Sequence, residues 1–298
     1  KTTRWEKSMK PAPFAYARAA TLDEAFGLLA EYGDDAKILA GGQSLMATLN
    51  MRLSEPEVLV DINYIDGLAG IEDTGAALRI GAMTRHVDVE TSDLIAIHTP
   101  LIAAAMDHIA HPAIRNRGTF GGSIAFADPA AELPASAVAL QATMHISGKD
   151  GSRDVAAAEF FEGLYETAIG PGEILTAISV PKIAPGWKSG FMELARRHGD
   201  YAIIGLAAQV ELNGGTFGDA RLVFFNAGDR PVSAPNTASL LAGQSWSDEL
   251  AEKLSVSLKD ELDPPDDLNA DGPMRKHLAG VLVKRTLGSI AAPLAGDQ

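Results

Sequence analysis

The sequence predicts an α+β fold, because its hydrophobic pattern changes character along the chain. The first two thirds alternate short apolar segments with stretches of helical period. Two prolines and two glycines gather at 181–190, a composition typical of a boundary. The last third then has long strand-like segments followed by helical ones. We therefore expect three parts, at 1–62, 63–182 and 187–298.

The first part resembles a small β-α-β unit. Thr21-Leu22-Asp23-Glu24 has the pattern of a capping box, and a helical period follows it as far as Gly33. Residues 36–40 and 58–62 are apolar and predict short buried strands. Between these strands we expect a turn at Gly41-Gly42 and a helix that Ser44 opens and that runs to about residue 51.

In the second part we expect a strand at 78–80, a short helix capped by Thr84 and a helix at 100–110. Residues 111–128 are rich in glycine and polar side chains without a clear period, which predicts a long functional loop. A helix at 130–141 and strands at 143–146 and 174–180 complete this part.

The third part has strand-like segments at 201–212 and 222–225. Helical segments follow at 246–258 and 274–290, separated by a linker around Pro264-Pro265. Strands followed by helices predict an α+β domain with its own sheet.

Composition excludes several classes of function. Lysine and arginine number 25 against 39 acidic residues, a net charge of −14 that disfavours nucleic acid and anionic membranes as partners. The absence of cysteine excludes disulfides, zinc–thiolate sites and iron–sulfur clusters held by this chain. Electron transfer by this chain would therefore need an organic cofactor. No strong membrane signal and no signal-peptide pattern at Lys1–Lys10 are present, so we expect a cytoplasmic protein.

Two glycine pairs lie in similar frames, one in Ala40-Gly41-Gly42-Gln43-Ser44-Leu45 and one in Thr119-Phe120-Gly121-Gly122-Ser123. Such pairs let bare backbone N–H groups approach a phosphate, and two of them would hold a diphosphate from both sides. Neither frame fits the Rossmann or P-loop pattern, and neither has a lysine. Two tight turns between packed elements explain the pairs equally well at this point.

Other polar residues have weaker patterns. His108 and His111 have the spacing of metal ligands but lack a third partner nearby, which favours two surface histidines. Arg115 and Arg117 would suit either a phosphate or a solvated loop. No residues form the pattern of a nucleophilic hydrolase, and we expect no catalytic side chain.

With these residues in view, nearly the whole chain resembles the FAD-binding medium subunits of the molybdenum hydroxylases, a group that includes carbon monoxide dehydrogenase and xanthine dehydrogenase. Both glycine frames match the family's two flavin loops. The resemblance continues in the following segments: Ile114-Arg115-Asn116-Arg117-Gly118, Ala127-Asp128-Pro129-Ala130-Ala131-Glu132-Leu133-Pro134, Gly199-Asp200-Tyr201-Ala202 and His277-Leu278-Ala279-Gly280-Val281-Leu282.

The resemblance implies a vanillyl-alcohol oxidase-like FAD-binding fold in two subdomains, 1–62 and 63–182, and a C-terminal flavoprotein domain at 187–298. Both glycine frames would contact the FAD diphosphate, Asp128 the ribose or adenine part, and Tyr201 the flavin ring. The chain departs from the family at Gln43, Ser123 and Phe126, where histidine or asparagine is frequent. Backbone contacts are expected to persist there.

The resemblance also implies partners. A large subunit would hold molybdopterin and hydroxylate the substrate, a small subunit would carry two [2Fe–2S] clusters, and the complex would be a dimer of heterotrimers. This chain would pass electrons to an external acceptor, and the serine form of the motif favours an N-heterocycle as substrate. The alternatives are a free-standing FAD-dependent oxidoreductase of related fold and a non-enzymatic assembly subunit whose glycine pairs are turns.

Overall fold

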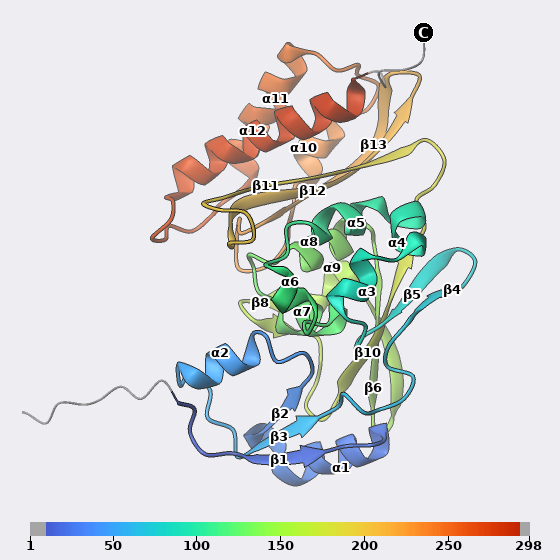
Figure 1. The fold of residues 1–298 in the computed structure, drawn as a ribbon. Coiled ribbons are helices and arrows are strands. Elements are labelled where there is room, and N and C mark those ends of the chain that lie inside the picture. Colours follow the sequence, from blue (N-terminus) through green and yellow to red (C-terminus); the bar gives the residue numbers. More distant parts are fainter. Residues whose placement is uncertain (1–9, 293–298) are drawn as a thin grey trace, which may run out of the picture.

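The computed structural model describes residues 10–292, which form three units stacked along one axis, from the bottom to the top of Figure 1. The N-terminal stretch in which we expected no signal peptide falls almost entirely outside these residues. Each of the three predicted parts contains one large sheet, and its extent as a domain stays a prediction. No helix within 10–292 has the length and apolar character needed to cross a membrane.

The first unit is a three-stranded parallel sheet in the order β1-β3-β2. Its central strand β3 is buried along its whole length, as is typical of a parallel strand covered on both faces. The elements are β1 (Ala15–Arg18), α1 (Leu22–Tyr32), the 3-10 turn η1 (Gly33–Asp35), β2 (Ala36–Leu39), α2 (Leu45–Asn50) and β3 (Val58–Asp61).

The predicted cap of α1 is confirmed, since the Thr21 hydroxyl accepts a hydrogen bond from the Glu24 N–H at 3.1 Å. The helix predicted to open at Ser44 is confirmed as α2, with Ser44 in the N-cap position, although the Ser44 hydroxyl makes no capping hydrogen bond. The pattern did not indicate β1, a short strand with mostly exposed side chains that forms by pairing with β3.

The second unit is built on an antiparallel sheet in the order β4-β5-β10-β6-β7. Its strands are β4 (Ile71–Asp73), β5 (Ala77–Gly81), β6 (Thr143–Gly148), β7 (Gly151–Ala156) and β10 (Ile174–Pro181), and a separate hairpin pairs β8 (Phe161–Gly163) with β9 (Glu166–Thr167). Its helices are α3 (His86–Glu90), α4 (Asp93–His98), α5 (Pro100–Met106), α6 (Pro112–Arg115), α7 (Phe120–Phe126), α8 (Glu132–Ala139) and α9 (Ala157–Phe160).

Two predictions for this unit are wrong. Residues 111–128 are not one long loop, because they contain α6 and α7. Glycine lowers helix propensity, but α7 is stabilised by a Thr119 cap and by packing against Ala82. Thr84 does not cap α3, since its hydroxyl donates to the Gly70 carbonyl and accepts from the Gly70 N–H.

The third unit is an antiparallel sheet in the order β11-β12-β13-β14, which confirms the predicted C-terminal α+β arrangement. Its elements are β11 (Trp187–Ala195), β12 (Ala202–Asn213), β13 (Thr216–Phe225), β14 (Val232–Ser233), α10 (Pro235–Ser239), α11 (Asp248–Glu261) and α12 (Gly272–Ala291). The helices α10 to α12 cover one face of this sheet, and α5 and α8 of the second unit lie on the other (Figure 1).

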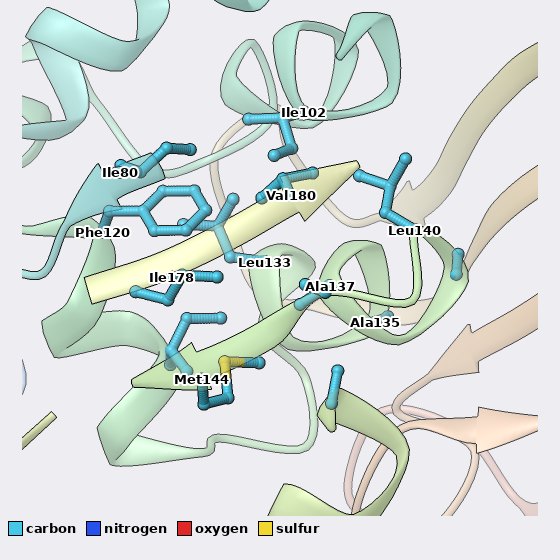
Figure 2. Close-up of a cluster of buried hydrophobic side chains, with 14 of the residues drawn as sticks. Ile80, Ile102, Phe120, Leu133, Ala135, Ala137, Leu140, Met144, Ile178 and Val180 are labelled. Atoms are coloured by element: carbon cyan, nitrogen blue, oxygen red, sulfur yellow. The ribbon is translucent and has the colours of Figure 1, made fainter. Parts of the chain in front are cut away.

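The second and third units share a hydrophobic core. Figure 2 shows Phe120, Leu133, Ile178 and other apolar side chains gathered around strand β10. Phe225 of β13 is fully buried in the same cluster, so the core continues from the second unit into the third. Phe120 at the start of α7 and Leu133 near the start of α8 thus belong to a core that spans two units.

Candidate functional site

The fold brings the two predicted glycine segments into contact. Gly41 lies so close to the second segment that a Cβ atom on it would be 2.4 Å from the Arg117 carbonyl oxygen. A Cβ atom on Gly122 would lie 3.8 Å from that of Ala40. The segments, about eighty positions apart in the chain, thus border one place in the molecule.

The first segment is an open loop between β2 and α2. Gly42 has φ +73°, a conformation that favours glycine. Within residues 10–292, no acceptor bonds the backbone N–H groups from Gly41 to Leu45. The side chain of Gln43 donates to the Gly41 carbonyl at 3.0 Å and so folds back on the loop. Successive unpaired N–H groups of this kind form a concave site for an anion.

The second segment is the first turn of α7, and its N–H groups already have partners in the protein. The N–H of Phe120 donates to the Thr84 carbonyl at 2.9 Å, and that of Gly121 to the Ala82 carbonyl at 2.8 Å. The N–H groups of Gly122 and Ser123 both donate to Thr119, to its hydroxyl and its carbonyl respectively. The second segment therefore borders the site without offering these four donors to a phosphate.

His86 supports the second segment through a hydrogen bond to its backbone. Its ring is almost fully buried, and Nε2 lies 2.9 Å from the Thr119 carbonyl oxygen. Burial lowers the pKa of His86 to about 4, so the ring is neutral and Nε2 donates to that carbonyl. The sequence pattern had not indicated this residue, because a lone histidine beside a short helix has no distinctive signal.

Asp128 and Tyr201, predicted for different parts of the cofactor, lie together. Burial raises the pKa of Asp128, and the hydrogen bond from the Ala130 N–H, at 2.9 Å, and the nearby Tyr201 hydroxyl oppose this rise. Burial of the hydroxyl and the neighbouring Asp128 charge raise the pKa of Tyr201 to about 12, although 67% of the tyrosine surface is exposed. Tyr201 is thus a hydrogen-bond donor at neutral pH.

This pair lies at the opposite end of α7 from the glycine segments. A helix of seven residues spans about 10 Å, which separates the two ends of the site. Asn226 fixes the pair's position, since its N–H donates to the Pro129 carbonyl at 2.6 Å and its side chain to the Ala202 carbonyl at 2.6 Å. Asn226 has φ 53° and was not indicated by the sequence pattern.

A cavity of about 550 Å³ opens beside Asp128, a size typical of cofactor and ligand sites. Tyr165, at the tip of the β8–β9 hairpin, lines this cavity. Its backbone has φ 59°, and its ring centroid lies 5.1 Å from that of Phe126. The residues that line the cavity are Asp128, Pro129, Ala130, Leu164, Tyr165, Asn226, Gly228, Asp229, Asp263 and Pro265.

The remaining candidates have structural roles. Arg115 forms a bidentate salt bridge with the Glu90 carboxylate, at 2.7 and 3.0 Å, and is not directed to a phosphate. His108 is not a free surface residue, because its Nδ1 lies 3.3 Å from the buried Glu193 carboxylate. No group of three acidic or histidine side chains suited to a metal ion occurs between residues 10 and 292.

Comparisons with known proteins show the family of both parts of the chain. The family "FAD binding domain in molybdopterin dehydrogenase" matches residues 12–183, and the family "CO dehydrogenase flavoprotein C-terminal domain" matches residues 189–290. The first match includes both glycine segments and Asp128, and the second includes Tyr201.

Similar proteins extend over nearly the whole chain. The 6-hydroxypseudooxynicotine dehydrogenase complex subunit alpha of Paenarthrobacter nicotinovorans is 39% identical over 280 residues, 94% of this chain and 95% of that protein. The carbon monoxide dehydrogenase medium chain of Hydrogenophaga pseudoflava is 35% identical over 287 residues, 96% of this chain and 100% of that one. A chain of quinoline 2-oxidoreductase from Pseudomonas putida 86 matches with a TM-score of 0.90 and 35% identity, covering 95% of this chain and 98% of that chain.

Proposed function

The chain belongs to the family of FAD-binding subunits of the molybdopterin dehydrogenases, and from this premise we propose that it is the electron-transferring medium subunit of a molybdenum hydroxylase. In this role it is part of an oxidoreductase and carries FAD. When bound, FAD would supply the redox chemistry, taking electrons from the [2Fe–2S] clusters of a partner and passing them to an external acceptor. The chain's own residues then bind and orient the cofactor.

The observation that carries the proposal is the run of unpaired N–H groups in the first glycine segment. Five consecutive donors, from Gly41 to Leu45, have no acceptor within the described chain. Unpaired backbone donors are unfavourable unless water or a ligand accepts from them, and a diphosphate supplies several charged acceptors at once. We therefore assign the diphosphate of FAD to Gly41, Gly42, Gln43, Ser44 and Leu45, with Ala40 at the edge.

The second segment would form the facing wall. Ser44 and Ser123 each have a hydroxyl without a protein partner between residues 10 and 292, and both are half-buried. In this proposal Thr119, Phe120, Gly121 and Gly122 set the position of that wall, and Ser123 contributes its hydroxyl. Asp128 and Tyr201 would face one and the same part of the cofactor, because the two side chains are near enough for each to shift the pKa of the other.

The proposal includes two partner subunits, one with the molybdopterin cofactor and one with the iron–sulfur clusters, in a dimer of heterotrimers. Its support is that relatives of full length are named as a medium chain or as a subunit of a complex. The lack of cysteine agrees with clusters held elsewhere. We propose an N-heterocycle as the substrate of the whole enzyme, in line with the name of the quinoline 2-oxidoreductase.

Two measurements test this function. The purified full chain should bind FAD and give the absorbance of a flavoprotein, whereas an assembly subunit with structural turns would be colourless. Expression together with the neighbouring genes should then yield a complex with a large and a small subunit, and electrons should reach the flavin only in that complex. Turnover of an organic substrate by the chain alone would contradict the proposal and favour a free-standing flavin enzyme.

A further inference from the structure

A network of hydrogen-bonded polar side chains links the two glycine segments. It begins at Asp61, the last residue of β3, which is only 6% exposed. Its carboxylate accepts from the Tyr16 hydroxyl at 2.6 Å and from the Asn63 side-chain amide at 2.6 Å. Burial raises the pKa of Asp61, but these hydrogen bonds outweigh it and hold the pKa below its usual value. The carboxylate is thus charged and fixes the orientation of Asn63.

Asn63 connects this network to the first glycine segment. Its Nδ2 donates to the Ala40 carbonyl at 2.9 Å and lies 3.3 Å from the Leu39 carbonyl. Its Oδ1 accepts from a terminal nitrogen of Arg85 at 2.6 Å. One side chain therefore contacts both the backbone at the start of the first segment and Arg85.

Arg85 connects the network to the second segment. Its other terminal nitrogen donates to the Arg117 carbonyl, the oxygen against which Gly41 packs. Its backbone also pairs with Thr119 in an isolated antiparallel bridge. Arg85 and Asn63 together thus link Ala40 to Arg117, across the seam where the two segments meet.

The two arginines at this seam lack a directly paired carboxylate within residues 10–292. Neither Arg85 nor Arg117 has a carboxylate within 4.0 Å in the described part of the chain, although the protein carries a net charge of −14. Burial, and then the nearby Arg117 charge, lower the pKa of Arg85. Asp88 and Asp61 offset part of the Arg85 charge from beyond 4.0 Å. The two arginines, beside a run of unpaired N–H groups, would still favour a diphosphate.

We propose that Asn63 and Arg85 are positioning residues of the diphosphate site: they hold the two glycine segments in register, so that the N–H groups of the first segment converge on the anion. The inference rests on the proposed function, since it deepens the assignment of the FAD diphosphate. Arg85 acts through the loops in this scheme, because both of its terminal nitrogens are already bonded to protein acceptors.

The test uses the purified full chain freed of cofactor, with FAD titrated by the quenching of flavin fluorescence. ADP, which carries a diphosphate but no flavin, serves as a competing probe of the same place. The variants are Arg85→Met, Asn63→Ala, their combination and Arg85→Lys. Arg153→Met is the matched control, because it removes one positive charge in β7 and an ion pair with Glu173, in a strand at the far edge of the sheet from β4.

We expect Arg85→Met and Asn63→Ala each to raise the dissociation constants of FAD and ADP about ten- to a hundredfold, the size typical of a lost charge-assisted hydrogen bond. The dissociation constants of the double variant should be only slightly higher than those of the weaker-binding single variant, since the two residues act as one bridge. Arg85→Lys should not restore affinity, because one ammonium group cannot reproduce the forked contact. Arg153→Met should bind as the wild type does.

Unchanged FAD and ADP affinity in Arg85→Met would overturn the inference while leaving the proposed function intact. The inference would also be overturned if the losses of affinity of the two single variants multiplied in the double variant, or if Arg85→Lys bound FAD as the wild type does. A loss of affinity that only followed a loss of stability of the cofactor-free protein would overturn it as well. If Arg85→Met does not fold, Asn63→Ala decides by the same criteria. A wild-type chain that binds no FAD would instead overturn the proposed function and this inference with it.

Discussion

The two glycine segments look alike in sequence and differ in physical role. In the first, Gly42 has a positive φ and five successive N–H groups lack protein acceptors in the described chain. In the second, the glycines lie in a helix, and the N–H groups of Phe120 to Ser123 are all bonded within the protein. In our proposal the first segment receives an anion, whereas the second is part of the packed structure against which the first is placed.

The difference shows that a short motif does not define how its backbone is used. Gly121 is required because a Cβ atom would lie 2.4 Å from that of Ala82. Gly42 is required by its own backbone conformation. The same residue type therefore serves close packing in one segment and backbone geometry in the other, and substitutions at the two sites should fail in different ways.

The largest expected effect separates stability from binding at these two glycines. Gly121→Ala forces a methyl group into the backbone of Ala82, and we expect it to lower the free energy of unfolding by about 3 kcal/mol or more. In Gly42→Ala the new Cβ atom meets only the side chains of Leu39, at 3.2 Å, and Met46, at 3.5 Å. The positive φ is nevertheless disfavoured by about 1–2 kcal/mol, which should displace the N–H groups. This variant should therefore stay folded and lose FAD affinity.

Urea unfolding of the cofactor-free protein and FAD titration measure the two effects. Gly27→Ala is the control, because its Cβ would meet no atom within 4 Å in helix α1 and should stabilise the protein slightly. Wild-type FAD affinity in Gly42→Ala would show that the first segment is not the diphosphate site.

The next effect concerns charge. An added carboxylate about 5 Å from a phosphate charge is unfavourable by about 3 kcal/mol at an effective dielectric constant near 20. Ser44→Asp should therefore weaken FAD binding by roughly a hundredfold at low salt, and less at high salt. Ser123→Asp should have a smaller effect, because the neighbouring N–H groups of α7 are bonded within the protein and do not hold a phosphate close to this position.

Titration with FAD at two salt concentrations checks this prediction, with Ser44→Asn and Ser123→Asn as uncharged controls. An equal loss in both aspartate variants would indicate that the diphosphate lies evenly between the two segments, and the distinction drawn here would then be wrong.

Helix α8, which follows the second segment in the chain, contains a buried carboxyl group that makes the stability of the protein depend on pH. Burial raises the pKa of Glu132 to about 8, from an ordinary value of 4.5. The folded protein then binds more protons than the unfolded chain between these values, so stability falls as pH rises through that window, by at most about 1.4 kcal/mol per pH unit.

Glu132→Gln keeps the shape of the side chain and removes its titration. We expect the variant to lose much of the decline in stability between pH 6 and pH 8, measured by urea unfolding of the cofactor-free protein. His108, whose pKa is raised by Glu193, contributes in the same direction and remains in the variant. Glu162→Gln, at an exposed position, is the control, and a Glu132→Gln curve parallel to that of the wild type would refute the assignment.

Elements with a local cause could be predicted from the sequence. Helix α1 begins at a capping box and ends at Gly33, and the buried strand β3 has a continuous apolar run. Helix α7 was not predicted, because, besides its local Thr119 cap, it depends on contacts with Ala82 and Thr84, residues distant in the chain. The pairing of glycine segments was indicated by their similarity, but their different hydrogen bonding depends on the fold.

The same limit applies to the site. Asn63 and Arg85 form no motif, since the groups that they link in the two glycine segments are backbone carbonyls at positions 39, 40 and 117. Asp128 and Tyr201 were named through family resemblance, yet their contact depends on how β12 begins beside the end of α7. Such relations between distant residues exist only in the folded chain.

The smallest expected effect sharpens the role of the second segment. Thr119 is buried, and its hydroxyl accepts from the Gly122 N–H at 3.1 Å as the cap of α7. Thr119→Val removes this acceptor and should lower the free energy of unfolding by about 1 kcal/mol, whereas Thr119→Ser keeps the cap. Because the hydroxyl is directed into the helix, FAD affinity should change only slightly in either variant. Thermal unfolding and FAD titration provide the comparison. A large loss of FAD affinity in Thr119→Val with unchanged thermal stability would place this hydroxyl on the cofactor, and would make the second segment a direct binding element like the first.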